Sequence, residues 1–213
     1  DYANAAGTFG IAKGLDPADT ELAALEAECD AKAKALELKV QAEHECDAKD
    51  FAEALHTFDA ALELWPDNAE IQAERDAAAR KLEAQALMKQ AKDELAADKA
   101  GKAVNHLKKA LELDLGNEDI SALKIEAEKK LKASKLLKEA LQEMAEGDNA
   151  GAAAHLRTAK SLDPEELAIQ TNLDECEKKL NALQLKRQGD IQAEHDAFDT
   201  AIASYTEALA LDP

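Results

Sequence analysis

The sequence predicts an all-α protein built of tandem helix-turn-helix units, on three observations. Ala, Glu, Lys, Leu and Asp dominate the 213 residues, and Ala and unbranched side chains lose little rotamer freedom in a helix. Only four Pro and eight Gly interrupt the chain, and no stretch alternates apolar and polar residues as a half-buried strand does. A Leu-Asp-Pro tripeptide, or a close relative of it, recurs every 49 residues.

The recurring tripeptide marks the end of a repeating unit. Its five copies end at Pro17, Pro66, Leu115, Pro164 and Pro213. The residues before each copy superpose as well: small residues at Ala5, Ala54, Ala103, Ala152 and Ala201, larger apolar ones at Phe9, Phe58, Leu107, Leu156 and Tyr205, and small ones again at Ala12, Ala61, Ala110, Ala159 and Ala208. These positions lie on one stripe of a helix.

We therefore divide the chain into one continuous array. Residues 1–17 are expected to be the closing helix of a preceding repeat, followed by repeats at 18–66, 67–115, 116–164 and 165–213. An array that starts on a closing helix is expected to be a piece of a longer protein.

Each tripeptide is predicted to separate two helices. An Asp side chain can accept a backbone N–H at a helix N-terminus, and Pro suits the first helical position, so Asp163-Pro164 is expected to cap and start the next helix. The copy at Leu115 lacks Pro, but Gly116 and Asn117 supply a helix stop and a new cap.

Two segments match a known repeat pattern. The run from Ile202 to Leu209 reads Ile-Ala-Ser-Tyr-Thr-Glu-Ala-Leu, and in the preceding unit Gly147-Asp148 stands where a turn before the equivalent helix is expected. Together they resemble the second helix of the tetratricopeptide repeat, which follows a Gly-Asp turn and ends in Leu-Asp-Pro. The resemblance implies a solenoid of stacked helical hairpins.

The first helix of each unit is predicted to be elongated. The tetratricopeptide unit has about 34 residues, so this unit is longer by about 15 residues, or roughly four helical turns. The added segment keeps an apolar stripe, at Ile169, Leu173, Cys176, Leu180 and Leu183. We expect a first helix of about 28 to 30 residues and a second of about half that length. If the long helix is straight, the array is an extended, staggered rod; a bend that creates a third short helix is the alternative.

Composition restricts the partners and the compartment. The net charge of −19 disfavours nucleic acid and anionic membranes, which need a basic surface. It is compatible with a basic or neutral protein partner, or with a role in solubility alone. No apolar run approaches the roughly 18 residues that span a bilayer, and three cysteines without a Cys-X2-Cys pair suit a reduced compartment. We expect a cytoplasmic protein.

The candidate chemical groups are interpreted as structural. The cysteines fall at packing positions, so no metal and no cofactor is expected. His106 and His155 share their place in the repeat with Thr8, Thr57 and Ser204, which predicts a surface position. Because no Ser or Cys has a recognisable base partner and no Gly-rich loop precedes a helix, the chain is not expected to be an enzyme.

Function is expected on the face of the first helices. In the tetratricopeptide resemblance this face lines a concave groove that receives peptides, and the matching positions are Lys39, Glu43, Met88, Lys92, Leu137, Leu141, Lys186 and Asp190. The Lys and Asn clamp by which some members hold a terminal carboxylate is not present. Trp65, which replaces the usual Asp before Pro66, either packs under a neighbouring helix or anchors a partner.

Two functions follow from this interpretation. The first is a scaffold that binds other proteins or peptides through the long-helix face. The second is an architectural spacer or cytoskeletal component, associated with neighbouring copies in a larger assembly. The low aromatic content weakens the first, since binding hot spots favour Trp, Tyr and Arg.

Overall fold

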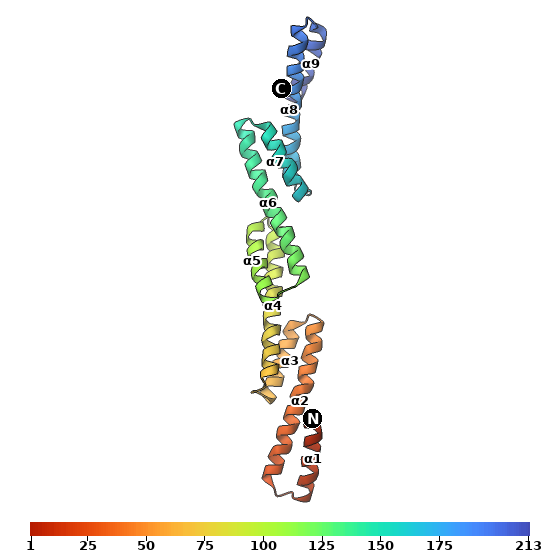
Figure 1. Ribbon diagram of the computed structural model, residues 1–213, viewed down its shortest axis with the longest axis vertical. Helices are drawn as coiled ribbons and strands as arrows, with labels where there is room; N and C mark the ends of the chain where they lie inside the picture. Colours follow the sequence, from red (N-terminus) through yellow and green to blue (C-terminus); the bar gives the residue numbers. More distant parts are fainter. The chain divides into compact units, whose positions relative to one another are not determined.

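All 213 residues are described by the computed structural model, which consists of nine α-helices and no strand (Figure 1). The short helices are α1 (Tyr2–Leu15), α3 (Phe51–Leu64), α5 (Ala100–Leu113), α7 (Asn149–Leu162) and α9 (Phe198–Leu211). The long helices are α2 (Thr20–Asp47), α4 (Ala69–Ala96), α6 (Glu118–Glu146) and α8 (Leu167–Glu194). The all-α fold of helical hairpins is confirmed.

Helix lengths agree with the prediction. Every short helix has 14 residues, and the long helices have 28 or 29. Each long helix runs without a break, so the bend that would create a third short helix is absent. The long helices begin at Thr20, Ala69, Glu118 and Leu167, which are 49 residues apart.

The chain divides into two compact units. One comprises residues 1–93 and 106–121, and the other comprises residues 94–105 and 122–213. In the first unit α2 contacts both α1 and α3, and in the second α8 contacts both α7 and α9.

Two short helices lie along each of these long helices, one after the other. Lys13 of α1 forms an ion pair of 2.8 Å with Glu26 in the first half of α2. In the second half of α2, Ala42 packs in one buried cluster with Phe58 of α3. A long helix is therefore twice as long as a short one because it has to cover two of them.

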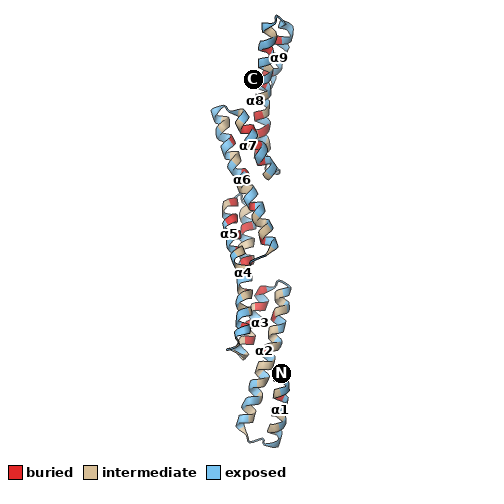
Figure 2. Ribbon diagram, viewed as in Figure 1, coloured by how far each residue is buried: buried red, intermediate tan, exposed pale blue.

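Each buried cluster is built from three helix segments (Figure 2). In the first unit the cluster consists of Ala35 and Ala42 of α2, Ala54, Phe58 and Ala61 of α3, and Ile71 and Ala78 of α4. In the second unit it consists of Ala133 and Ala140 of α6, Ala152, Ala153, Leu156 and Ala159 of α7, and Ile169, Leu173 and Cys176 of α8. The alanines let the helices approach closely, and larger side chains such as Phe58 and Leu156 fill the space between them. Both α3 and α7 are thus buried between the second half of the preceding long helix and the first half of the following one.

The predicted capping of the long helices is wrong by three residues. Asp16 and Asp163 end the short helices as their C-caps, and the prolines after them lie in the turn. The caps stand later: Asp19 accepts the backbone N–H of Leu22, and Glu166 accepts that of Ala168. Asp-Pro makes the turn itself, so a further residue has to satisfy the next helix start. At the junction without Pro, the predicted cap is confirmed, since the Asn117 Oδ1 accepts the N–H of Ile120 at 3.1 Å.

Two of the three cysteines lie where packing was predicted, and Cys29 is half-buried. Cys176 is buried in the second cluster, and Cys46 packs against the first. Burial raises the pKa of both thiols above its ordinary value, because the thiolate is less well solvated there. Both side chains therefore act as small apolar residues.

Candidate functional site: the α8–α9 groove

Of the eight predicted partner-binding residues, three make contacts within the chain that leave them little access to a partner: Lys39, Glu43 and Leu137. The Lys39 Nζ lies 2.6 Å from Glu43, 3.3 Å from Glu70 and 2.9 Å from Glu74, and the last two belong to α4. The Lys39 side chain is only 12% exposed, and these carboxylates, Glu43 first, raise its pKa. Leu137 packs against the buried cluster of the second unit.

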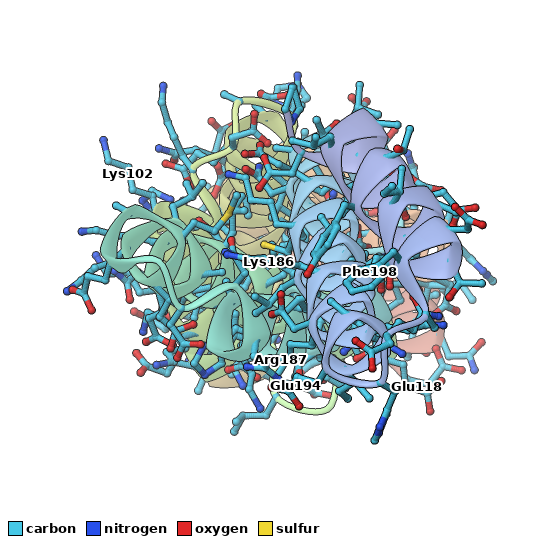
Figure 3. The ribbon with its side chains drawn as sticks, turned by 90° about the horizontal axis from the view of Figure 1, so that it is seen from above. Lys102, Glu118, Lys186, Arg187, Glu194 and Phe198 are labelled. Carbon is cyan, nitrogen blue, oxygen red and sulfur yellow. The ribbon has the colours of Figure 1, made fainter.

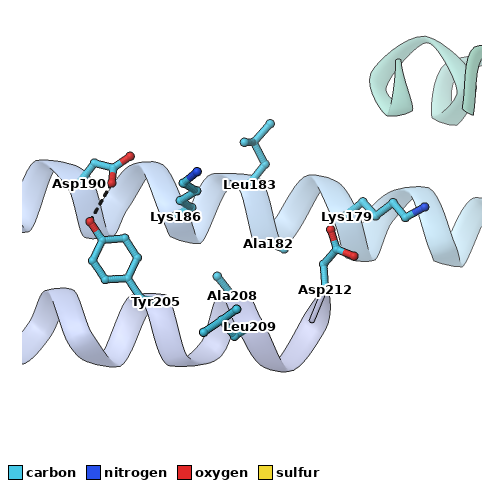
Figure 4. A pocket seen from close by; sticks show the side chains of 9 residues that line it. All are labelled: Lys179, Ala182, Leu183, Lys186, Asp190, Tyr205, Ala208, Leu209 and Asp212. Atoms are coloured by element: carbon cyan, nitrogen blue, oxygen red, sulfur yellow. Dashed lines mark hydrogen bonds between the residues drawn. The ribbon is translucent and has the colours of Figure 1, made fainter. Parts of the chain in front are cut away.

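The remaining predicted residues differ in their surroundings. Met88 is half-buried, and Lys92 and Leu141 are exposed. Lys186 and Asp190 are also exposed, and together they line a groove of about 630 Å³ between α8 and α9 (Figure 4). The structure therefore brings two of the predicted residues into one surface feature.

The groove has an apolar floor with charged residues at its edges. Its lining consists of Lys179, Ala182, Leu183, Lys186, Asp190, Tyr205, Ala208, Leu209 and Asp212. The Tyr205 hydroxyl donates to Asp190 Oδ1 at 2.7 Å, and this hydrogen bond raises the pKa of Tyr205 above its ordinary value. In Figure 4 this pair closes one end of the groove, and Lys179 lies beside Asp212 at the other. Lys186, between them, forms no ion pair.

Two apolar side chains of α9 are more exposed than their equivalents in the earlier short helices. Phe198, the first residue of α9, is 58% exposed, whereas Phe51 at the equivalent position of α3 is 7% exposed. Ile202 is 62% exposed, whereas its equivalent in α7, Ala153, is fully buried. In α3 and α7 the following long helix supplies the cover. Figure 3 labels Phe198 and Lys186 on the two helices that border the groove.

An exposed apolar surface accompanies the groove. Leu183 and Ile191 of α8 and Phe198, Ile202 and Leu209 of α9 are all exposed. Elsewhere in Figure 3 the labelled side chains that extend into solvent are charged, such as Lys102, Glu118 and Glu194. A group of exposed apolar side chains is typical of an interaction site.

A set of four lysines was missed by the sequence-based prediction. Lys32, Lys81, Lys130 and Lys179 occupy the same position in the four long helices. The first of them reaches the place where the end of α3 meets the start of α1, since the Lys32 Nζ lies 5.3 Å from the Trp65 ring centroid and 5.6 Å from that of Tyr2. The signal is present in the sequence as four identical residues spaced by 49, at a polar position outside the apolar stripe.

Lys81 and Lys130 meet other partners than Lys32 does. The Lys81 Nζ lies 5.6 Å from the ring centroid of Phe51, and the Lys130 Nζ lies 3.9 Å from Asp163 Oδ2. A cation at this place also interacts favourably with the carbonyl groups at the C-terminus of the short helix. Lys32 and Lys130 thus lie at the C-terminal end of a short helix, whereas Lys81 lies beside the first residue of one.

The histidines are less exposed than the sequence predicted. Thr57 and Ser204, at the same position in the repeat, are buried, and His106 and His155 are half-buried. The position faces the long helix of the same hairpin, where polar residues pair across it. His155 Nδ1 lies 2.8 Å from Glu143 Oε2, and the Ser204 hydroxyl donates to Gln192 Oε1 at 2.8 Å.

Trp65 packs within the first unit. Its ring meets that of Tyr2 edge-on, with 5.3 Å between centroids, and it contacts the buried cluster of α2, α3 and α4. Of the two alternatives, the geometry agrees with packing under neighbouring helices.

Comparison with known proteins adds no family. Neither a protein-family model nor a curated protein matches this sequence. None of the nine helices combines the length and the apolar character that crossing a bilayer requires. Function therefore has to be inferred from the geometry of the groove.

Proposed function

We propose that this chain is a protein-binding scaffold of tetratricopeptide-like repeats with an elongated unit of 49 residues, and that the α8–α9 groove is its binding site. The repeat assignment is supported by helix starts spaced by 49 residues and by the run from Ile202 to Leu209. The observation that carries the binding role is the groove itself, where an apolar lining that includes Leu183 and Leu209 lies beside the charged Lys186 and Asp190.

The groove meets the physical requirements of a protein interface. It offers apolar area at Ala182, Leu183 and Leu209, which gains about 25 cal/mol for each Å² removed from water. Tyr205 supplies an aromatic side chain already fixed by its hydrogen bond to Asp190, so little side-chain entropy is lost on binding. Lys186 supplies an unpaired charge that can select the orientation of the partner.

Site-specific photo-cross-linking tests the proposal. A benzophenone amino acid replaces Leu209 in the groove or, as a matched control, the similarly exposed Leu167 at the start of α8. The proposal expects Leu209 to cross-link a partner in cell extract that Leu167 does not. That partner, identified and purified, should bind the wild-type chain with low micromolar affinity and the Leu209→Asp variant much more weakly. Identical cross-links from both positions would contradict the proposal.

A second function is favoured by a different observation. Lys39 and Leu137, on the face expected to bind peptides, are used in contacts between helices of the chain. A face used in this way suits an architectural spacer, whose repeat geometry is itself the function. End-to-end association that rises with protein concentration, measured by sedimentation velocity and small-angle X-ray scattering, would favour the spacer, whereas a monomer with a groove-specific partner would favour the scaffold.

A further inference from the structure

The α4–α5 turn and the middle of α6 form a pocket of about 360 Å³, which we call the basic pocket. Its lining consists of Asp98, Lys99, Ala100, Gly101, Lys102, Leu131 and Ser134, all within the second unit. Lys99 and Lys102 are exposed and form no ion pair, and Figure 3 shows Lys102 extending into solvent. Helices precede and follow these elements in the chain, so the pocket is open with its neighbouring helices in place.

The positive charge is specific to this hairpin. Lys99 and Lys102 correspond to acidic or neutral residues in the other hairpins: Asp1 and Asn4, Asp50 and Glu53, Asp148 and Gly151, and Ala197 and Thr200. Lys135 is exposed and stands one turn after Leu131 on the same side of α6, and its equivalents are Glu37, Ala86 and Gln184. Residues 129–138 include five lysines and no carboxylate, in a chain whose net charge is −19.

Two replacements on α6 explain why the space is open and apolar at its floor. At the α2–α3 turn, Gln85 of α4 donates to the Lys49 carbonyl at 3.2 Å and so lies against the turn. The equivalent of Gln85 in α6 is Ser134, whose shorter side chain forms no hydrogen bond within the chain. The residue three positions before Gln85 is a lysine, whereas its equivalent in α6 is Leu131. The pocket thus combines an apolar floor with cations at its edge.

The acidity of the rest of the chain restricts the occupant. A long polyanion or an anionic membrane would extend beyond the basic pocket and meet the acidic remainder, where repulsion acts over a Debye length of about 8 Å. A short acidic stretch of a protein can neutralise the lysines without reaching that remainder. Charge complementarity therefore favours a short protein segment.

We propose that the basic pocket binds an acidic segment of another protein, in which one apolar side chain enters the pocket toward Leu131 and flanking Asp or Glu carboxylates pair with lysines at its edge. Those lysines are Lys99, Lys102 and Lys135. The site shares no residue with the α8–α9 groove, so the inference goes beyond the proposed function and does not depend on it.

The probe is a fluorescein-labelled peptide in which Leu is flanked on both sides by Glu. Its binding to the full 213-residue chain is measured by fluorescence anisotropy, and amide chemical shifts locate the contact. We expect shifts at the α4–α5 turn and around Ser134. The same peptide with Gln in place of Glu should bind at least tenfold more weakly, since its attraction to the lysines is lost.

Charge reversal in the chain tests the role of the lysines. The double variant Lys102→Glu/Lys135→Glu should weaken binding about tenfold, because two attractions become repulsions. The matched control is Lys34→Glu/Lys89→Glu, at two exposed lysines outside the pocket, which changes the net charge equally. The control should leave binding nearly unchanged, and equal effects of the two double variants would overturn the assignment.

Gly101→Met tests the pocket without changing the charge. A Cβ at Gly101 would stand 3.7 Å from Leu131 Cδ1, an ordinary van der Waals contact, and Met is a better helix former than Gly, so the variant should fold. Its side chain should fill the pocket and weaken binding of the Leu peptide about fivefold, while a peptide with Ala in place of Leu binds both proteins alike. Equal binding of the Leu peptide to the wild-type chain and to Gly101→Met would show that no apolar side chain enters.

Two other occupants have distinct signatures, and either would overturn the inference. If a peptide with phosphoserine in place of Glu binds more than tenfold more tightly, the ligand is a phosphorylated segment. If the chain self-associates in sedimentation velocity and the Lys102→Glu/Lys135→Glu variant does not, the occupant is a second copy. Failure of Leu209 to cross-link a partner would contradict the proposed function alone, because Leu209 lies outside the basic pocket.

Discussion

The aromatic ring of Tyr205 lies directly on the backbone of α8 at Gly189. A Cβ built on Gly189 would stand 2.7 Å from Tyr205 Cε1 and 2.9 Å from its Cδ1, closer than side chains tolerate. The earlier hairpins place Ala at this position, and in the first unit Ala42 packs in one cluster with Phe58. The difference comes from the tyrosine hydroxyl, because its bond to Asp190, the next residue of α8, draws the ring onto the helix.

Gly189→Ala should therefore act in opposite directions in two backgrounds. In the wild-type chain it should destabilise the protein by about 1 kcal/mol, because the clash costs about 1–3 kcal/mol and the gain in helix propensity is smaller. In a Tyr205→Leu background, which resembles the earlier hairpin with Ala140 and Leu156, it should stabilise by about 1 kcal/mol. Urea denaturation of the four proteins measures both values. The same sign in both backgrounds would show that the ring does not exclude a methyl group.

Lys39→Met should destabilise the first unit although the equivalent residue of the next repeat is Met88. The substitution leaves Glu43, Glu70 and Glu74 close together without their cation. Because these carboxylates are partly exposed and screened, the expected loss is about 1 kcal/mol, below the cost of a fully buried broken pair. Chemical denaturation monitored at Trp65 reports on this unit.

The prediction for Lys39→Met has a control variant and a rescue variant. Lys34→Met alters an exposed lysine of α2 that has no ion pair, so stability should stay unchanged. Adding Glu74→Leu to Lys39→Met should recover most of the loss, since one repulsive carboxylate is removed and the two introduced apolar side chains can contact each other. A double variant as unstable as the sum of the singles would show that the two residues do not interact.

The sequence predicted the helices well and the groove poorly, for identifiable reasons. The lengths of α2 and α3 followed from the 49-residue period, because a helix needs only its own periodicity and its stop signals. Lys39 and Leu137 were assigned to a free binding face by resemblance to a shorter repeat. That resemblance does not contain the first half of the following long helix, which covers Lys39. The groove depends on how α8 and α9 pack against each other, a tertiary fact that the local pattern does not encode.

Protonation of His155 should stabilise the second unit at mildly acidic pH. Its hydrogen bond to Glu143 raises the pKa of the imidazole above its ordinary value, against the opposing effect of desolvation, and Glu139 adds a weaker attraction. The folded-state pKa thus exceeds the unfolded one, so the contribution is complete below about pH 6.5 and is lost as the pH rises through the folded-state pKa. Unfolding midpoints between about pH 5 and 8 should show this fall.

Glu143→Gln is the matched change, because Gln192 occupies the same position in the last hairpin and pairs there with Ser204. The variant should lower the pKa of His155, measured by NMR titration, and flatten the pH dependence of stability in that range. An unchanged titration curve would mean that the His155–Glu143 contact does not persist in solution.

The last prediction concerns the contact of Trp65 with Tyr2 and Lys32 in the first unit. Trp65 is the only tryptophan, so tryptophan emission reports on this contact alone. With Tyr2 against one edge of its ring and the Lys32 ammonium 5.3 Å from its centroid, the emission should be blue-shifted and weakly quenched by iodide. Lys32→Ala should shift the emission to longer wavelength and increase quenching, because the lysine stem also shields the ring. Lys34→Ala, at an exposed neighbouring position, should leave the spectrum unchanged, and equal shifts in both variants would mean that Lys32 does not hold the ring in place.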